Sequence, residues 1–413
     1  MNPIRQALPR MTAAAAGCAA VLAPTAVLAA AAPAPASGRA VQQAHASTVT
    51  VYVASNTSDT VTPIPAATDK PGKPIRVHGS PTAIAITPNG KTAYVISISG
   101  GSGYVTAIST ATNTVVRAIR VPGDPAAIAI TPNGQTAYVA LSTSTVVIPI
   151  RTATNAKGKP IHVGLAPRGI AITPNGKIAY VTDSTANRVT PIVTATNTAL
   201  HSIRVGPLPE GIAITPNGKT AYVANFSLGL GQTVTPIRTA TNKAGRAVTV
   251  GQGPFCVAIT PNGKTAYVTG DMSDTVTPID TATNKAGHPI NVGAAPNGIA
   301  ITPNGKTVYV ANSLSGTVTP ISTATNTAGP PIGVGADPIY LAITPNGKTV
   351  YVANFNGTMS GGTGDTITPI STATNTAGKP ITVGRGPLYI AITPAHSHAA
   401  PEAAPAGCEP VAS

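Results

Sequence analysis

Eight near-copies of one phrase of about 43 residues run from Ser47 to Pro394, and this repetition constrains the fold more than any other feature of the chain. Each copy reads P-x-G-I-A-I-T-P-N-G-K-T, then A-Y-V-A-N, T-V-T-P-I, T-A-T-N and I-x-V-G. The prolines of the I-T-P steps are 42 to 49 residues apart and are Pro88, Pro132, Pro174, Pro216, Pro261, Pro303, Pro345 and Pro394. A period in this range is typical of solenoids and propellers.

Each phrase contains four short runs rich in β-forming residues, separated by turn chemistry that leaves no room for a helix. Four strands per repeat predict an all-β propeller blade. The array opens on a second strand (residues 51–53) and closes on a lone first strand (residues 389–393). We therefore expect eight four-stranded blades in one ring, with the C-terminal strand completing the first blade. A seven-bladed ring with one irregular repeat also fits the count.

A proline recurs inside the third predicted strand of seven repeats: Pro63, Pro149, Pro191, Pro236, Pro278, Pro320 and Pro369. Proline has no N–H and breaks a ladder hydrogen bond. We expect its nitrogen to face the outermost strand, which must be short, bulged or loosely paired there. Ala107 replaces the proline in the remaining repeat.

The phrases at residues 222–225 and 309–312, both Y-V-A-N, resemble the YVTN repeat of bacterial and archaeal surface β-propellers, as do the T-V-T-P-I and T-A-T-N runs around them. The resemblance covers about 350 of the 413 residues. It implies a propeller fold. It implies little about activity, because the same scaffold is associated with surface proteins, lactonases, lyases and subunits of redox enzymes.

Residues 1–38 resemble an export signal, with Arg5 and Arg10 before an apolar run and small residues for cleavage near 29–38. A lipoprotein signal ending at Cys18 is the alternative, but its expected upstream Leu is absent. We then expect a linker at 39–46, the propeller at 47–394 and a disordered Pro/Ala-rich tail at 395–413. The predicted location is secreted, with or without association with the cell surface, and no transmembrane anchor is expected.

Two cysteines, Cys256 and Cys408, remain after the expected cleavage. We therefore predict no disulfide framework, so ring closure and blade packing must supply the stability. Cys256 opens a predicted inner strand and is interpreted as a small buried apolar residue.

The charges are few but unbalanced, with 26 Lys and Arg against 12 Asp and Glu. Propeller geometry predicts a basic face made by the P-N-G-K turns, with Lys91, Lys177, Lys219, Lys264, Lys306 and Lys348. Such a ring favours an anionic cell-wall polymer as partner. The alternative is that a copied turn carries a solubilising lysine wherever it is copied. Nucleic acid is not expected, because no aromatic residues are interleaved with the basic ones. We expect a monomer.

On the opposite face, the residue after each Gly-x-x-Pro proline is predicted to line the channel mouth. These positions vary between repeats, unlike most of the phrase. Together with nearby tyrosines they give the candidate site for a protein, peptide or glycan ligand: Arg168, Glu210, Phe255, Asn297, Tyr340 and Tyr389.

No catalytic, cofactor or metal-binding constellation is predicted. Arg168 and Glu210 are neighbours in the ring order, which favours a salt bridge over an acid/base pair. The mouth supplies too few oxygen ligands for a hard cation and no histidine. The sequence therefore favours an exported, non-catalytic binding or cell-surface scaffold. The alternative is a lactonase- or lyase-like enzyme with its site at the mouth.

Overall fold

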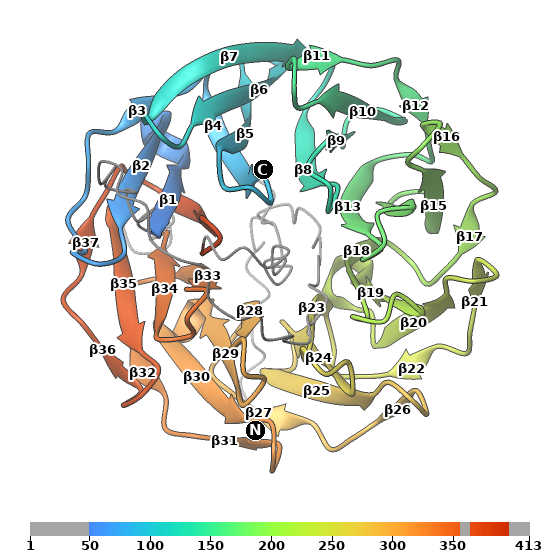
Figure 1. The fold of residues 1–413 in the computed structure, drawn as a ribbon. Coiled ribbons are helices and arrows are strands. Elements are labelled where there is room, and N and C mark those ends of the chain that lie inside the picture. Colours follow the sequence, from blue (N-terminus) through green and yellow to red (C-terminus); the bar gives the residue numbers. More distant parts are fainter. Residues whose placement is uncertain (1–48, 356–363, 396–413) are drawn as a thin grey trace, which may run out of the picture.

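The computed structural model describes residues 49–355 and 364–395, and forms an all-β ring of eight blades around a central axis (Figure 1). This confirms the predicted fold class and selects eight blades over seven. The expected export signal and linker lie outside the described residues, as does the tail apart from residue 395.

The three inner positions of each blade are regular strands. The innermost strands are β4 (Ser80–Ile86), β8 (Pro125–Ile130), β13 (Pro167–Ile172), β18 (Pro209–Ile214), β23 (Pro254–Ile259), β28 (Pro296–Ile301), β33 (Pro338–Ile343) and β38 (Pro387–Ile392). The second strands are β1 (Thr50–Ser55), β5 (Thr92–Ser99), β9 (Thr136–Leu141), β14 (Ile178–Asp183), β19 (Thr220–Asn225), β24 (Thr265–Gly270), β29 (Thr307–Asn312) and β34 (Thr349–Asn354). The third strands are β2 (Thr60–Pro65), β6 (Ser102–Ser109), β10 (Val146–Arg151), β15 (Arg188–Val193), β20 (Thr233–Arg238), β25 (Thr275–Asp280), β30 (Thr317–Ser322) and β35 (Thr366–Ser371).

The outermost position differs between blades. The first two blades have β3 (Ile75–Arg76) and β7 (Thr114–Val121) there, whereas each of the other six has two short pieces. These pieces are β11 (Ala156–Lys157) with β12 (Ile161–His162), β16 (Thr198–Ala199) with β17 (Ile203–Arg204), β21 (Lys243–Ala244) with β22 (Val248–Thr249), β26 (Lys285–Ala286) with β27 (Ile290–Asn291), β31 (Thr327–Ala328) with β32 (Ile332–Gly333), and β36 (Thr376–Ala377) with β37 (Ile381–Thr382). Three short 3-10 turns complete the described structure: η1 (Asn56–Ser58), η2 (Ser227–Gly229) and η3 (Ser313–Ser315).

The recurring proline explains the divided rim. In β10, Pro149 pairs with Tyr138 of β9 on the inner side, while β11 and β12 pair with β10 on either side of the proline. The Gly158 N–H donates to the Pro149 carbonyl at 2.7 Å, from outside. The nitrogen of a strand residue points to the same side as its carbonyl, so the proline ring faces the outermost strand, as expected. Where Ala107 replaces the proline, β7 is one strand of eight residues, although its register with β6 shifts between Ala107 and Ile108.

The ring closes as expected, because the C-terminal strand β38 pairs antiparallel with the N-terminal strand β1. The Thr50 N–H donates to Thr393 Oγ1 at 2.8 Å, and the Thr393 N–H donates to the Thr50 carbonyl at 2.9 Å. The inner strand β38 also packs between β33 and β4, its neighbours in the ring. The two ends of the propeller thus share one sheet.

A tyrosine at the centre of each second strand ties every blade to the next. All eight are fully buried, and each hydroxyl donates to an Asn or Asp side chain in the T-A-T-N turn of the following blade at 2.5 to 2.6 Å. The pairs are Tyr52–Asn113, Tyr94–Asn155, Tyr138–Asn197, Tyr180–Asn242, Tyr222–Asn284, Tyr267–Asn326, Tyr309–Asn375 and Tyr351–Asp69. Burial raises the pKa of Tyr222, and of five others, to about 12, so these phenols stay protonated as donors.

The last of these pairs crosses the point of ring closure. Tyr351 donates to Asp69, which holds the place that Asn has in the other seven turns. Asn and Asp tolerate the left-handed backbone that this position requires, with φ of 54° at Asp69.

We predict that Tyr351→Phe lowers the free energy of unfolding by about 1 kcal/mol, because it removes a buried hydrogen bond between the first and last blades. Urea unfolding followed by circular dichroism measures this. Tyr104→Phe is the control, since Tyr104 is only half-buried and lies outside the set of interblade tyrosines. Equal stability of Tyr351→Phe and the wild type would contradict a stabilising role for the closing bond.

Candidate functional site

The candidate mouth residues begin the inner strands, at the position after the turn proline. Most of them are buried between neighbouring blades: Glu210 is 7% exposed, Phe255 6% and Leu388 3%. Arg168 and Asn297 are half-buried. These side chains are therefore less exposed than expected for residues predicted to line the channel mouth.

Glu210 lies in a polar group built from two adjacent blades. The Ser184 hydroxyl donates to Glu210 Oε1 at 3.1 Å, and the Thr182 hydroxyl donates to the Glu210 carbonyl at 3.0 Å. Glu210 Oε2 is buried and has no hydrogen-bond partner in the described structure. Burial raises the pKa of Glu210 to about 7, while the charge of Arg168 and the Ser184 hydrogen bond act in the opposite direction. This carboxyl can therefore exchange a proton near neutral pH.

A second buried carboxyl, Asp183, ends β14 in the same region. Three other blades have Asn at this position, and Asn225 donates there to the hydroxyls of Thr233 and Thr235 at 3.0 Å. At Asp183 the direction of the hydrogen bond is reversed, because here the Thr190 hydroxyl donates to the carboxylate. Burial raises the pKa of Asp183 to about 7, opposed mainly by that hydrogen bond.

Neither Asp183 nor Ser184 was expected from the sequence to be a site residue. The sequence does contain a signal for this group, because two paired positions differ from the repeat. Asp183 stands where three blades have Asn, and Arg188 stands where those three blades have the Thr that pairs with this Asn across the strands.

The aromatic candidates form two separate pairs. Phe255 packs edge-on against Phe226, with ring centroids 5.5 Å apart. Tyr340 and Tyr389 stack at 3.9 Å, and the Tyr340 hydroxyl donates to that of Tyr389 at 3.0 Å. Asn297 is not joined to either pair by a described contact, and its Oδ1 is buried without a hydrogen bond from the described residues.

Cys256 is fully buried, as expected, but the interpretation of it as a simple apolar residue was wrong. It is disulfide-bonded, and the described structure contains no free cysteine. Its backbone N–H donates to Thr269 Oγ1 at 3.0 Å, which fixes its place at the start of β23. The error arose because a disulfide depends on proximity in space, which spacing along the chain does not give.

The other face of the ring is built by the P-N-G-K turns. In the first of them, the Thr87 hydroxyl and the Lys91 N–H both donate to Asn89 Oδ1, at 2.8 and 3.0 Å. The Thr110 N–H of the T-A-T-N turn donates to the Lys91 carbonyl at 3.1 Å, which places the two kinds of turn on the same face. The same Asn-to-Lys bond recurs in all the lysine-bearing turns, and every one of these lysines is exposed: Lys91, Lys177, Lys219, Lys264, Lys306 and Lys348.

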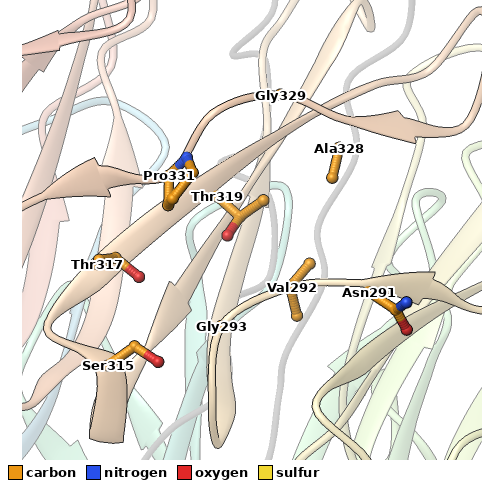
Figure 2. Close-up of a pocket in the computed structure, with 9 residues that line it drawn as sticks. All are labelled: Asn291, Val292, Gly293, Ser315, Thr317, Thr319, Ala328, Gly329 and Pro331. Atoms are coloured by element: carbon orange, nitrogen blue, oxygen red, sulfur yellow. The ribbon is translucent and has the colours of Figure 1, made fainter.

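A groove of about 270 Å³ lies away from the mouth, between the outer parts of the sixth and seventh blades (Figure 2). Thr317 and Thr319 line it, and both hydroxyls already accept hydrogen bonds from the Asn312 amide, at 3.1 and 2.8 Å. None of its lining residues is titratable: Asn291, Val292, Gly293, Ser315, Thr317, Thr319, Ala328, Gly329 and Pro331. It therefore has no group for acid–base chemistry.

Within residues 49–355 and 364–395, no three His, Cys, Asp or Glu side chains gather as a metal site would require. None of the helices in the same ranges has the length and apolar character needed to cross a membrane.

Comparison with solved structures finds propellers. The chain is similar to Kuenenia stuttgartiensis hydrazine synthase, with 26% identity and a TM-score of 0.57 over 71% of this chain and 96% of that one. A functionally unknown protein from Desulfotomaculum acetoxidans DSM 771 has 18% identity and a TM-score of 0.56, over 68% of this chain and 94% of that one. The dihydro-heme d1 dehydrogenase NirN, in complex with DHE, has 12% identity and a TM-score of 0.66, over 81% and 73%. No family model and no curated protein matches the chain.

We predict that Glu210→Gln raises stability at pH 8 by on the order of 2 kcal/mol and leaves it unchanged at pH 4. A carboxyl whose pKa is raised by folding stabilises the protein below its ordinary pKa of 4.5, and this contribution is lost as pH rises through about 7. Thermal unfolding across this pH range measures the difference. Asp365→Asn, an exposed carboxyl on the same face, is the control. A loss of stability in Glu210→Gln at pH 8 would instead show an ionised Glu210 paired with Arg168.

Proposed function

We propose that this protein is an exported, non-catalytic β-propeller of the YVTN repeat type that binds an anionic cell-wall polymer through its lysine face. The observation that carries the proposal is the ring of six exposed lysines on structurally equivalent turns. The Y-V-A-N phrases and the signal-like N-terminus support the family type and the export.

The turns make the lysine array regular. Each lysine backbone is fixed by the Asn side chain two residues before it, and each intervening glycine has a positive φ of 68° to 71°. A polymer with a phosphate at every repeat unit can meet several such charges at once, which multiplies weak contacts. Exposed charges act through water, so the binding must weaken as salt rises.

More cations surround the ring on the same face. They lie in or near the T-A-T-N turns and are exposed: Lys73, Lys157, Lys159, Lys243, Arg246, Lys285 and Lys379. Two acidic residues near these turns are already engaged, since Asp69 accepts the Tyr351 hydroxyl and Asp280 accepts from Thr283. The electrostatic potential of this face is therefore positive.

The channel mouth is the second surface of the scaffold in this proposal, open to a protein, peptide or glycan. The polar group at Arg168 and Glu210 and the aromatic pairs at Phe255 and Tyr389 supply its contacts. Because most of these side chains are already buried, the lysine face takes the leading role.

We expect the triple variant Lys177→Gln, Lys219→Gln and Lys264→Gln to bind poly(glycerol phosphate) teichoic acid at least tenfold more weakly at low salt. The matched control is Arg76→Gln, Arg117→Gln and Arg204→Gln, which removes the same charge from exposed positions on the rim strands β3, β7 and β17. Pull-down on immobilised polymer at low and high salt is the measurement. Equal losses in the two variants, or wild-type binding that ignores ionic strength, would exclude the lysine ring as the binding surface.

A second candidate function is a lactonase- or lyase-like enzyme at the mouth. It is favoured by Glu210, whose pKa of about 7 and contact with Ser184 suit general acid–base work. A screen of aliphatic and aryl lactones tests it: turnover that Glu210→Gln abolishes and Asp365→Asn retains would establish the enzyme. If the wild type turns over none of these lactones, the enzyme hypothesis fails and the scaffold hypothesis stands.

A further inference from the structure

We propose that Tyr340 and Tyr389 form a site of oxidative modification, at which a dityrosine bond joins two neighbouring blades beside the point of ring closure. Both residues belong to inner strands, Tyr340 to β33 and Tyr389 to β38, and these strands pack against each other in the ring. The strand β38 also closes the ring by pairing with β1. A covalent bond at this place holds the closing strand to the blade before it.

The two tyrosines occupy the same position of the repeat, two residues after the turn proline. The other six blades have a small residue there: Ala83, Ala127, Gly169, Gly211, Cys256 and Gly298. The space between inner strands is narrow, because a Cβ added at Gly298 would lie 2.5 Å from the Ile339 carbonyl oxygen of the next inner strand. Large side chains at this position therefore occur only on two neighbouring blades, where the two rings meet.

The two phenol rings are held in the contact that coupling between ring carbons requires. Their centroids are 3.9 Å apart and their planes make an angle of 23°, whereas the centroids of aromatic pairs are usually ~4.5–7 Å apart. The Tyr340 hydroxyl donates to the Tyr389 hydroxyl at 3.0 Å. In each ring the carbons ortho to the hydroxyl lie between the centroid and the oxygen, and both of these points are close across the pair. The ortho carbons of the two rings are therefore in contact.

The other tyrosines do not share this arrangement. Eight of them donate to Asn or Asp side chains at the blade interfaces, and Tyr104 lies against His78 with ring centroids 5.1 Å apart. Among the aromatic contacts of the described residues, two tyrosine rings meet only at Tyr340 and Tyr389. These two residues are 5% and 7% exposed, which leaves little surface for a tyrosyl radical of another molecule. The geometry favours coupling within one chain.

The coupling is a two-electron oxidation. Each phenol loses one electron and its hydroxyl proton, and the unpaired electron of the resulting phenoxyl radical is shared with the ortho carbons. A C–C bond forms between one ortho carbon of each ring, and the hydrogens of these two carbons then move to the oxygens and restore both hydroxyls. Two electrons and two protons leave in total. A peroxide is the oxidant: hydrogen peroxide takes up both, its O–O bond breaks, and two water molecules form.

The site is tested by photo-oxidation of the dilute full-length protein with ruthenium tris-bipyridine and persulfate, a peroxide that accepts two electrons and becomes two sulfate ions. After disulfide reduction and trypsin digestion, cross-linked peptides are identified by mass spectrometry. Tyr340 falls in the tryptic peptide 307–348, and Tyr389 in the one that begins at residue 386. We expect these two peptides to be joined, with the loss of two hydrogen atoms, in a protein that stays monomeric on a denaturing gel. No cross-link, one between other tyrosines, or one found in dimers would overturn the proposal.

Two variants, Tyr340→Phe and Tyr389→Phe, each remove one phenol hydroxyl and keep the aromatic ring. Both should lower the dityrosine fluorescence of the oxidised protein at least tenfold, whereas the control Tyr104→Phe should retain it. Thermal unfolding before oxidation checks that each variant keeps the propeller, and the peptide map of the wild type decides the matter if one does not. Wild-type fluorescence in either folded variant would contradict the assignment.

The cross-link should also stabilise the closed ring. Tyr340 and Tyr389 are 49 residues apart, and a bond between them restricts the unfolded chain as a disulfide does. We expect oxidation to raise the Tm of the wild type by on the order of 5 °C and to leave that of Tyr389→Phe unchanged. An unchanged wild-type Tm, or equal shifts in the two proteins, would exclude this stabilising role.

Discussion

The packing of each blade against the next is the constraint on which this structure depends. A propeller blade is apolar on both faces, so it cannot be stable alone and must be covered on each side. Here one hydrogen bond recurs at every interface, from a buried tyrosine to the Asx residue of the following turn. Such a bond in an apolar interface sets the relative position of two blades, because the phenol has few other partners. The hydrogen bond from Tyr351 to Asp69 joins the last blade to the first, so these bonds run around the whole ring.

Much of the fold could be predicted from the sequence, because the same strand and turn signals occur in eight copies. The turn signals, the strand alternation and the terminal half-repeat lead to eight blades and to the sharing of one sheet by β1 and β38. The proline at positions such as Pro149 even predicts the divided rim. The interblade hydrogen bonds were not predicted, since Tyr52 and Asn113 are 61 residues apart and nothing local links them.

The candidate sites also differ in how far the sequence predicts them, according to whether local sequence or packing between blades sets their geometry. The lysine face was predictable because Lys91 and its equivalents occupy a copied turn whose geometry is set by neighbouring residues. The polar group at Glu210 was only partly predictable. Its proximity to Arg168 follows from blade order, but its burial and its contact with Ser184 depend on how two blades pack. The disulfide at Cys256 was not predictable, because a pairing between residues that are distant in sequence leaves no trace in the local sequence.

The divided outer strands also affect how copies of this protein behave near one another. An exposed sheet edge is a template on which another chain can add a strand, and this leads to aggregation. Six blades present only two-residue fragments at that edge, interrupted where Pro149 and its equivalents lie. The longer edge strand β7 is the exception, and it carries the exposed residues Arg117 and Arg120. Like charges on such an edge repel a second copy, which disfavours the addition of one sheet edge to another.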